Sequence, residues 1–323
     1  MNNTIFKVLI ITASLLNLSF SAYSQMNGYG VVNQSVINLK TSSSYASEMS
    51  SQALLGTPVH ILETANGWIK VITPEGYHAW TTDESITKMK ADEFKNWNKA
   101  SKLIVTTYFS ILRKQPTDNA DVVSDVVLGD LIRYQGIIGN YYKVQLPDGR
   151  TAYLPTAHAS PFAKWLSTRK HTSAKIITIA KYFVGFPYLW GGTSIKGMDC
   201  SGFSKTCFFM NGVILPRDAS QQALTGENID ITKDFSQLQP ADLLFFGSKA
   251  EGKEHIIHVA IYIGNGEFIH SSGMVKIGCL YTNNSLYDAY NTNRILRAQR
   301  ILTRIDKDAN IVSIEKHPFY QNK

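Results

Sequence analysis

One cysteine and two histidines in the second half of the chain have the residue types of a thiol nucleophile and its base. Cys200 lies in the segment Asp199-Cys200-Ser201-Gly202-Phe203, His258 opens a strongly apolar run farther along, and His270 follows on the next strand-like segment. A cysteine becomes a nucleophile when a nearby imidazole accepts its proton, and a third polar group orients that imidazole. We therefore predict Cys200 as the nucleophile, His258 as its base and His270 as the residue that holds the base, as in a cysteine peptidase or amidase.

The position of Cys200 at the predicted start of a helix bears on its reactivity. Asp199 is of a type that caps helix N-termini, and the apolar segment after Cys200 continues as a buried helix. A helix N-terminus carries partial positive charge, and together with a protonated imidazole it would favour the thiolate. The backbone N–H of Cys200 would stabilise the oxyanion of the reaction, and the hydroxyl of Tyr188 would be a second donor.

The same residues allow other interpretations. Cys200 could be an inert core cysteine and His258 a strand-end histidine. His255, His258 and His270 could instead be zinc ligands, but that site would need a fourth ligand and would leave the cysteine motif unexplained. We therefore predict neither a metal nor a cofactor.

The N-terminus has the pattern of an export signal. A weakly basic start precedes the apolar stretch Val8 to Leu16, which is too short to span a bilayer. Ala22-Tyr23-Ser24 then supplies small residues at the two positions that a signal peptidase recognises, which predicts a signal peptide over residues 1–24. We expect an exported protein, periplasmic or associated with the cell wall, without an integral membrane segment in the mature chain.

Cysteine usage and charge add two expectations. Of the three cysteines, Cys207 and Cys279 have core-like surroundings, and a disulfide between them stays open in an oxidising compartment. The formal net charge is +7, but no run of five Lys or Arg forms a basic patch, so no nucleic-acid partner is predicted. A length of 323 residues favours two or three domains.

An internal repeat occupies the first half of the chain. Residues 39–85 align without a gap with residues 112–158, so that Trp68 falls on Tyr141 and Lys70-Val71 on Lys143-Val144. Short β-rich segments are separated by turn sequences in both copies, which is typical of small barrels. We predict barrels over residues 27–88 and 101–160, with short amphipathic helices after each, at Met89–Trp97 and Pro161–Lys170.

The remaining segment, residues 171–300, shows helices first and strands afterwards, which is an α+β order. Helical spacing covers Ala174–Phe183, a buried helix follows Cys200, and an Asp-capped helix starts near Asp218. The predicted strands are Ala241–Phe246, His258–Ile263, Glu267–Ser271 and Val275–Tyr281. The tail, residues 301–323, alternates apolar and charged residues and is expected to pack back as an extra strand.

Five sequence blocks in this segment resemble, in order and spacing, the NlpC-type cell-wall peptidases, which are papain-like enzymes that cut peptidoglycan stem peptides. The blocks are Tyr188-x-Trp190-Gly191-Gly192, Asp199 to Phe203, Leu215-Pro216-Arg217, Asp242 to Phe246 and His258 to Gly264. One departure is Ala241, which stands where these enzymes usually have glycine. The repeat is similar to bacterial SH3-like domains. The resemblance thus implies an α+β papain-like domain preceded by two small all-β SH3-like barrels.

The resemblance also implies a substrate. Relatives with two such barrels are γ-D-glutamyl-L-diamino-acid endopeptidases that require a free L-alanine amine, so the expected partners are short peptidoglycan-derived peptides. Asp199 and Glu48 would bind the ammonium group, and the second repeat, with Asp121 and Arg150 at the matching positions, would be architectural. The other implied contacts are Tyr77 lining the same wall, Trp190 packing on the alanyl end, Ser201 adding a hydrogen bond and Arg217 binding the α-carboxylate of the D-glutamyl residue.

The sequence leaves two other classes of function open. The same fold could serve as an amidase, transpeptidase or acyltransferase. Alternatively, the chain could bind the wall through its barrels and carry a vestigial catalytic domain. The leading prediction is an exported endopeptidase that acts on short muropeptides, most simply as a monomer.

Overall fold

Two antiparallel sheets with the same strand order form the first half of the chain. The computed structural model describes residues 28–321, so the predicted signal peptide lies outside the described residues. The first sheet has the order β3-β2-β6-β5-β4-β1-β7 and the second the order β10-β9-β13-β12-β11-β8-β14. The repeat seen in the sequence is therefore a repeat of topology as well. Neither order closes into a ring, so the closed barrels that we predicted are not confirmed.

The strands of the first sheet are β1 (Gly28–Val32), β2 (Val36–Lys40), β3 (Met49–Leu54), β4 (Pro58–Ala65), β5 (Trp68–Ile72), β6 (His78–Thr82) and β7 (Ile86–Met89). Those of the second are β8 (Lys102–Val105), β9 (Phe109–Arg113), β10 (Val122–Val127), β11 (Leu131–Ile138), β12 (Tyr141–Gln145), β13 (Thr151–Pro155) and β14 (Ala159–Pro161). The predicted helices follow each sheet as α1 (Ala91–Lys99) and α2 (Phe162–Ser167).

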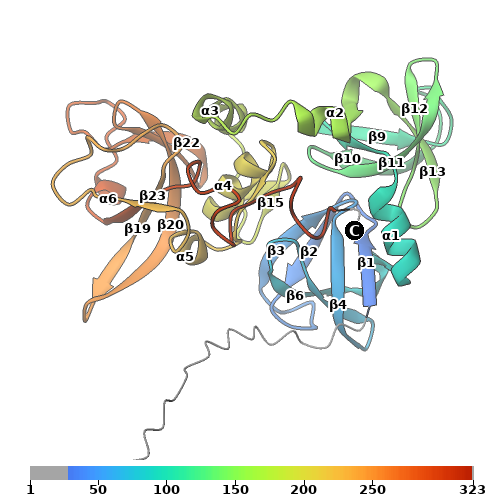
Figure 1. Cartoon of the computed structure of the whole chain (residues 1–323), viewed down its shortest axis with the longest axis horizontal. Helices are drawn as coiled ribbons and strands as arrows, with labels where there is room; N and C mark the ends of the chain where they lie inside the picture. Colours follow the sequence, from blue (N-terminus) through green and yellow to red (C-terminus); the bar gives the residue numbers. More distant parts are fainter. Residues whose placement is uncertain (1–27, 322–323) are drawn as a thin grey trace, which may run out of the picture.

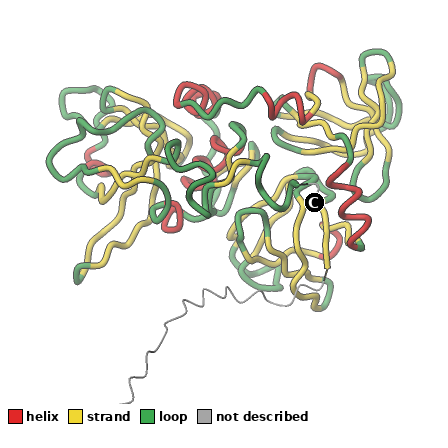
Figure 2. The backbone as a smooth tube through the Cα atoms, viewed as in Figure 1, coloured by secondary structure: helices red, strands yellow, loops and turns green. Residues whose placement is uncertain are grey.

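The second half of the chain builds a six-stranded antiparallel sheet with helices beside it (Figures 1 and 2). Its strand order is β18-β23-β19-β20-β21-β22. The strands are β18 (Glu227–Ile229), β19 (Leu243–Ala250), β20 (Lys253–Gly264), β21 (Glu267–Ser272), β22 (Met274–Cys279) and β23 (Ile295–Arg300). The helices are α3 (Ser173–Tyr182), α4 (Cys200–Phe209), α5 (Ala219–Gln222) and α6 (Ala289–Thr292). The predicted α+β order is confirmed.

Helix α4 is apolar on most of its surface because it is enclosed on several sides. It packs against α3 and against strands β20 and β21. Phe203 and Cys207 on the helix and Val259 and Ile261 on β20 are fully buried in one apolar core. A helix that is buried all round positions its first residue rigidly, and here that residue is Cys200.

The two N-terminal sheets are joined by close backbone contacts. The backbone N–H of Leu131 donates to the carbonyl of Leu55 at 2.9 Å, and the N–H of Leu55 donates to Oδ1 of Asp130 at 3.2 Å. Gly56, the residue after Leu55, has a φ of +79°, and a Cβ there would stand 2.0 Å from the carbonyl oxygen of Leu131. Only glycine allows both that conformation and that approach.

The C-terminal tail crosses from the second half of the chain to the first sheet. Its strand β24 (Val312–Ser313) pairs with β17 (Val213–Ile214), as expected for an extra strand. Beyond it, the ring of Phe319 stacks on His60 of the first sheet with 4.3 Å between ring centroids. The tail therefore ties the two halves together.

All three cysteines lie in the described part of the chain, and all three are free thiols. The disulfide between Cys207 and Cys279 that the sequence left open is therefore absent. Each of the two is fully buried, Cys207 on α4 and Cys279 at the end of β22, and both fill core space. No helix among the described residues is long and apolar enough to cross a membrane.

Ala241, the departure from the resemblance noted above, adopts a left-handed backbone. Its φ is +76° and its side chain is buried. Glycine would hold this conformation without strain, whereas an L-residue with a Cβ loses roughly 1 kcal/mol there. The turn before β19 is therefore kept despite the substitution.

Candidate active site

Cys200 is the first residue of α4, and Asp199 caps that helix as predicted. The side-chain Oδ1 of Asp199 accepts a hydrogen bond from the backbone N–H of Gly202 at 2.7 Å. A Cβ on Gly202 would stand 2.0 Å from the carbonyl oxygen of Gly192. The glycine in the Asp-Cys-Ser-Gly motif thus lets the Gly191-Gly192 loop pack directly on the first turn of the helix. That contact fixes the segment that carries the nucleophile.

The Cys200 thiol lies in a dry environment, 7% exposed. Burial, with the charge of Asp199, raises the pKa of Cys200 to about 11, although the backbone amides of Val259 and Ser201 act in the other direction. Burial therefore favours the neutral thiol, whereas the helix terminus and a protonated imidazole favour the thiolate that we expect. Cys200 can attack only if its proton moves to a base as the new bond forms.

His258 and His270 form a directly hydrogen-bonded pair on neighbouring strands. Nε2 of His258 lies 2.8 Å from Nδ1 of His270. The pair packs between two aromatic rings, Phe246 beside His258 at 5.7 Å and Phe268 beside His270 at 5.2 Å between centroids. This bond uses Nε2 of His258, so Nδ1 is the nitrogen that remains for a thiol proton. The backbone N–H of Val259, the next residue, lies at the Cys200 sulfur, so the strand that carries His258 passes beside the nucleophile. The transfer of the proton from Cys200 to His258 stays a prediction.

Burial keeps both imidazoles neutral. It lowers the pKa of His258 to about 3, with the neighbouring His270 as a further cause, and that of His270 to about 4. In the unfolded chain both would titrate near 6.5. Protons are then bound more strongly by the unfolded chain, so stability from these groups is complete above about pH 6.5 and declines as the pH falls toward 4 and 3.

We expect this linkage to be measurable between pH 6.5 and pH 5, where ordinary carboxyl groups barely titrate. The free energy of unfolding should fall by about 1 kcal/mol or more over that interval, and the thermal midpoint should fall with it. A His258→Gln/His270→Gln variant should lose a large part of the pH dependence in this interval, and His60 and His317, whose pKa burial also lowers, should supply the remainder. An unchanged slope in the variant would show that other groups cause the decline.

Tyr188 lies near the nucleophile, as predicted for a second oxyanion donor. Burial and the charges of Cys200 and Asp199 raise the pKa of Tyr188 to about 12. The phenol therefore keeps its proton at neutral pH and can donate a hydrogen bond. Its role as a donor to the oxyanion stays a prediction.

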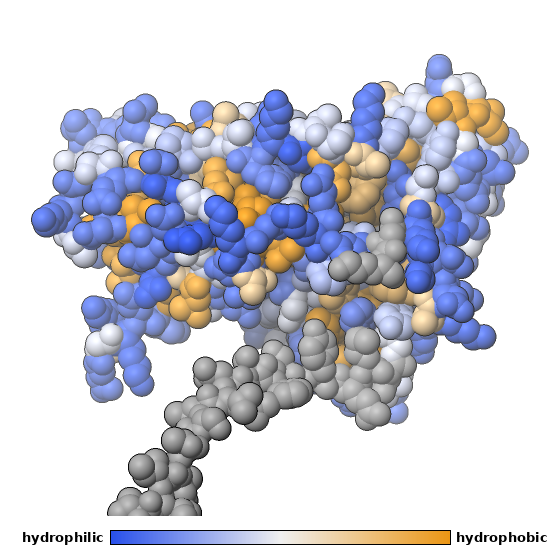
Figure 3. Space-filling view, viewed as in Figure 1, coloured by the Kyte–Doolittle hydropathy of each residue, from blue (hydrophilic) through white to orange (hydrophobic). Residues whose placement is uncertain are grey.

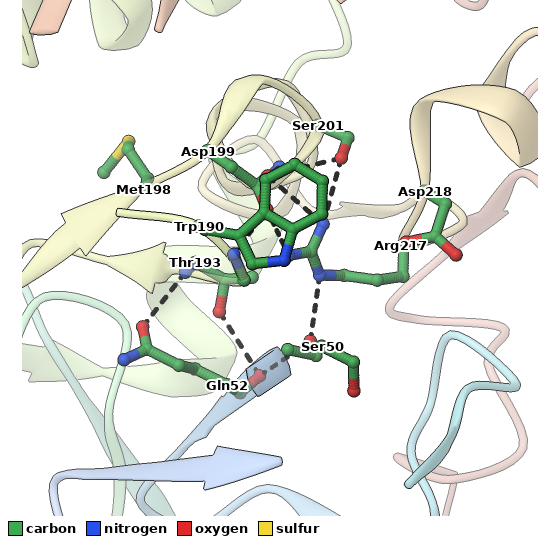
Figure 4. Close-up of polar contacts among 12 residues, drawn as sticks. Ser50, Gln52, Trp190, Thr193, Met198, Asp199, Ser201, Arg217 and Asp218 are labelled. Atoms are coloured by element: carbon green, nitrogen blue, oxygen red, sulfur yellow. Dashed lines mark hydrogen bonds and ion pairs between the residues drawn. The ribbon is translucent and has the colours of Figure 1, made fainter. Parts of the chain in front are cut away.

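Arg217 forms a buried ion pair with Asp199 (Figure 4). Nη1 and Nη2 of Arg217 donate to the two carboxylate oxygens at 3.2 and 2.6 Å, and Nη1 also donates to Oγ of Ser201 at 2.9 Å. Nε donates to Oγ of Ser51 on strand β3 at 3.0 Å. Most of the five N–H donors of the guanidinium are thus engaged within the protein. The predicted contact of Arg217 with a substrate carboxylate is untested, and its side chain is only 2% exposed.

Glu48 reaches the catalytic half from the first sheet. Its Oε1 accepts a hydrogen bond from Nε1 of Trp190 at 2.6 Å, and the indole of Trp190 is 61% exposed. Gly191 has a φ of +77°, and a Cβ there would stand 2.4 Å from the carbonyl oxygen of Met49. The absence of a side chain at this position therefore lets the chain pass close to Met49. The structure thus brings together Glu48, Trp190 and, through Gly191, Asp199, whose Oδ2 accepts from the Gly191 N–H at 3.0 Å.

Tyr77 also faces this junction from the first sheet. Its pKa is raised by burial and by the charge of Asp218, and a hydrogen bond with Ser50 acts in the other direction. The charges of Arg217 and Asp199 act on it as well. The residues implied by the resemblance therefore lie in one region, although no described contact tests their binding of substrate.

Two contributors were missed by sequence reasoning. Ser51 accepts a hydrogen bond from Arg217. Gln52 accepts hydrogen bonds through Oε1 from the N–H of Thr193 (Figure 4) and from Oγ of Ser194, each at 3.0 Å. Both follow Glu48 closely on the first sheet. Their types are common on surface strands, so only their position against the catalytic half reveals them.

The zinc alternative receives no geometric support from these residues. His258 and His270 bond each other, whereas His255 is exposed on β20. Within residues 28–321 no group of three or more His, Cys, Asp and Glu could hold a metal ion.

Two parts of the chain match known families. Residues 185–300, which contain the nucleophile and both histidines, match the NlpC/P60 family, and residues 39–86 match the bacterial dipeptidyl-peptidase Sh3 domain. A γ-D-glutamyl-L-lysine dipeptidyl-peptidase of Bacillus cereus is 32% identical over 234 residues, covering 70% of this chain and 68% of the relative. The chain belongs to the NlpC/P60 family. It is a cysteine peptidase with an SH3-like domain.

Other members of the NlpC/P60 family agree with this assignment. The enzyme of the same name from Bacillus subtilis is 32% identical over 229 residues, covering 68% of this chain and 71% of the relative. A crystal structure of an NlpC/P60 protein from Bacillus cereus superposes with a TM-score of 0.70 at 25% identity, covering 84% of this chain and 99% of that one. An endopeptidase from Photobacterium damselae, at 15% identity and a TM-score of 0.61, shows the same fold.

Proposed function

We propose that this protein is an exported endopeptidase that cleaves the γ-D-glutamyl–diamino acid bond of short peptidoglycan peptides with a free N-terminal L-alanine. The observation that carries the proposal is the contact of Glu48 with Trp190, which holds a carboxylate of the first sheet against an exposed indole in the loop that precedes Cys200. Two relatives whose names state γ-D-glutamyl-L-lysine dipeptidyl-peptidase activity support the bond and the release of a dipeptide.

Acylation begins with the neutral thiol. His258 takes the Cys200 proton on Nδ1 while sulfur attacks the γ-carbonyl carbon of the D-glutamyl residue. The oxyanion that forms accepts hydrogen bonds from the Cys200 backbone N–H and from the Tyr188 hydroxyl. When the intermediate collapses, the imidazolium of His258 gives its proton to the departing amine of the diamino acid, which leaves a thioester on Cys200.

Deacylation uses the same groups in reverse. A water molecule loses a proton to Nδ1 of His258 and attacks the thioester carbonyl, and the C–S bond then breaks. The proton returns to the Cys200 sulfur, which restores the neutral thiol, and the dipeptide leaves as a free acid. Throughout, the bond between Nε2 of His258 and Nδ1 of His270 fixes the plane of the base.

Glu48 is the better partner for a substrate ammonium, for reasons of charge. Asp199 is already neutralised by Arg217 in a buried pair. Glu48 is exposed, and among its described contacts only the neutral indole of Trp190 bonds its carboxylate. A cation brought against it would form a charge-assisted hydrogen bond beside the exposed indole. Asp199 then contributes mainly by holding Gly191 and the first turn of α4.

The N-terminal half narrows the entrance in this proposal, so that freed muropeptides enter and intact polymer does not. The second sheet would be a second SH3-like barrel with an architectural role. Its Asp125 accepts from Nζ of Lys196 at 2.9 Å and thereby braces the catalytic half. The signal sequence predicted for residues 1–24 would direct the protein to the periplasm or the cell wall.

Glu48→Gln tests the ammonium contact. The variant should lose about tenfold to a hundredfold in kcat/KM on L-Ala-γ-D-Glu-diaminopimelate, because one charge-assisted bond is removed. The loss should appear mainly in KM. As a matched control, Asp121→Asn at the equivalent place of the second sheet should leave both parameters unchanged. Equal kinetics of Glu48→Gln and the parent protein would remove Glu48 from the binding site.

A further inference from the structure

The outer nitrogen of the second histidine is buried without a partner. His270 is fully buried, and among the described residues its Nε2 has no hydrogen-bond partner. Its other nitrogen, Nδ1, is engaged by His258. When the thiol proton moves to His258, the pair carries a positive charge in an apolar setting between Phe246 and Phe268. Such a charge is costly unless an anion lies close by.

Asp288 lies on the face of the sheet that carries His270. Phe268 pairs with Gly278 and His270 with Lys276 on strands β21 and β22, so all four residues face the same side. A Cβ on Gly278 would stand 2.8 Å from the Phe268 ring and 3.3 Å from Cβ of Asp288. The absence of a side chain at Gly278 therefore lets Asp288 approach this face.

The carboxylate of Asp288 is fixed by its own neighbours. It caps helix α6 by accepting from the Asn291 backbone N–H at 3.0 Å, and it accepts from Nδ2 of the same residue at 2.5 Å. Its backbone N–H donates to the Cys279 carbonyl at 2.9 Å. Burial alone would raise the pKa of Asp288, but these hydrogen bonds and the charges of His270 and Lys276 hold it below its usual value. Asp288 is therefore an anion at neutral pH.

Three charged side chains act on the His270 ring in the described part of the chain. Asp288 favours its protonated form, whereas Lys276 and Arg294 oppose it. The same three groups act on His258 in the same directions. Of the three, Asp288 is the only anion, so it alone offsets both the two cations and the charge that develops on the pair.

We propose that Asp288 is a positioning residue of the active site, which stabilises the positive charge that the His258–His270 pair acquires when Cys200 gives up its proton. This role extends the Cys–His–His arrangement by a fourth group and deepens the proposed function, on which it rests. Asp288 does not touch the substrate. Its charge acts on His270 and, through the bond between the two imidazoles, on the base His258.

The test uses alkylation of Cys200 by iodoacetamide in the full-length protein, because that reaction needs no peptide substrate. The Asp288→Asn variant keeps a residue that caps helices as well as aspartate and removes only the charge. The second-order rate of alkylation, followed by mass spectrometry of the Cys200 peptide from about pH 3 to pH 9, should fall about threefold to tenfold on its plateau. That factor corresponds to a change of about 0.5 to 1 in an imidazole pKa. The acidic limb should move to lower pH.

Lys276→Gln is the control of opposite sign. It removes a cation that opposes protonation of the same ring, so its acidic limb should move to higher pH and its plateau should rise. If Asp288 had only a structural role, Asp288→Asn would lower the thermal midpoint without moving the acidic limb of the alkylation profile. An alkylation profile of Asp288→Asn that coincides with that of the parent would overturn the proposal. Failure of the proposed function would appear separately, as normal alkylation without peptide cleavage.

Discussion

Replacing Cys200 by alanine should reduce peptide hydrolysis by a factor of about 1,000 or more and leave the fold intact. The sulfur forms the covalent intermediate, and no other described side chain occupies its place at the start of α4. The thiol is a small part of the core, so the thermal midpoint should change little. Turnover measured by liquid chromatography of the peptide products, together with the midpoint, checks both parts.

The matched control for this variant lies on the same helix. Cys207→Ala removes a fully buried sulfur two turns farther along α4, so it should cost some stability and keep turnover. Hydrolysis by Cys200→Ala at a rate near that of the parent would mean that another residue is the nucleophile. Loss of turnover in both variants to the same extent would point to damage of the helix and not to chemistry.

Replacing Arg217 by methionine should have the largest effect on stability. The change leaves the carboxylate of Asp199 buried without its cation, and it also breaks the bond to Ser51 on the first sheet. Removing one partner of a buried ion pair costs about 3–5 kcal/mol. The thermal midpoint and the urea midpoint should both fall strongly, and kcat/KM should fall with them because Asp199 also holds Gly191 and the first turn of α4.

A double variant separates the ion pair from the packing. Arg217→Met combined with Asp199→Asn leaves no unpaired charge, and asparagine still caps the helix, so part of the lost stability should return. The thermal midpoint and the urea midpoint of Arg217→Met should both lie below those of the double variant. A single variant as stable as the parent would contradict the account of this pair as a buried, mutually dependent unit.

The sequence predicted best what is encoded in contiguous motifs. Helix α4, the strands with His258 and His270, and the bond between these two imidazoles follow from local pattern, because each motif sits on one element and neighbouring strands pair. The strands of the repeat followed from turn residues such as Pro147-Asp148-Gly149, and the two sheets share one topology. The predicted closure of each sheet into a barrel was not confirmed, because closure requires the two edge strands of a sheet to pair with each other and local sequence does not specify that pairing.

What the sequence could not show depends on groups distant in the chain. The helix terminus and the imidazole favour the thiolate of Cys200, whereas burial of the sulfur, which local sequence does not reveal, raises its pKa to about 11 and favours the neutral thiol. The motif of Arg217 likewise gives no sign that Asp199 lies against its guanidinium. Ser51 and Gln52 acquire their roles only where the first sheet meets the catalytic half.

The most direct test of the central claim is mass spectrometry of the products from L-Ala-γ-D-Glu-diaminopimelate, beside the same peptide with its amine acetylated. The account predicts cleavage of the free peptide at the γ-D-glutamyl bond, with release of L-Ala-γ-D-Glu, and no cleavage of the acetylated one. Equal cleavage of both would keep the peptidase and contradict recognition of the ammonium by Glu48. Persistence of both peptides intact would contradict the proposed reaction itself.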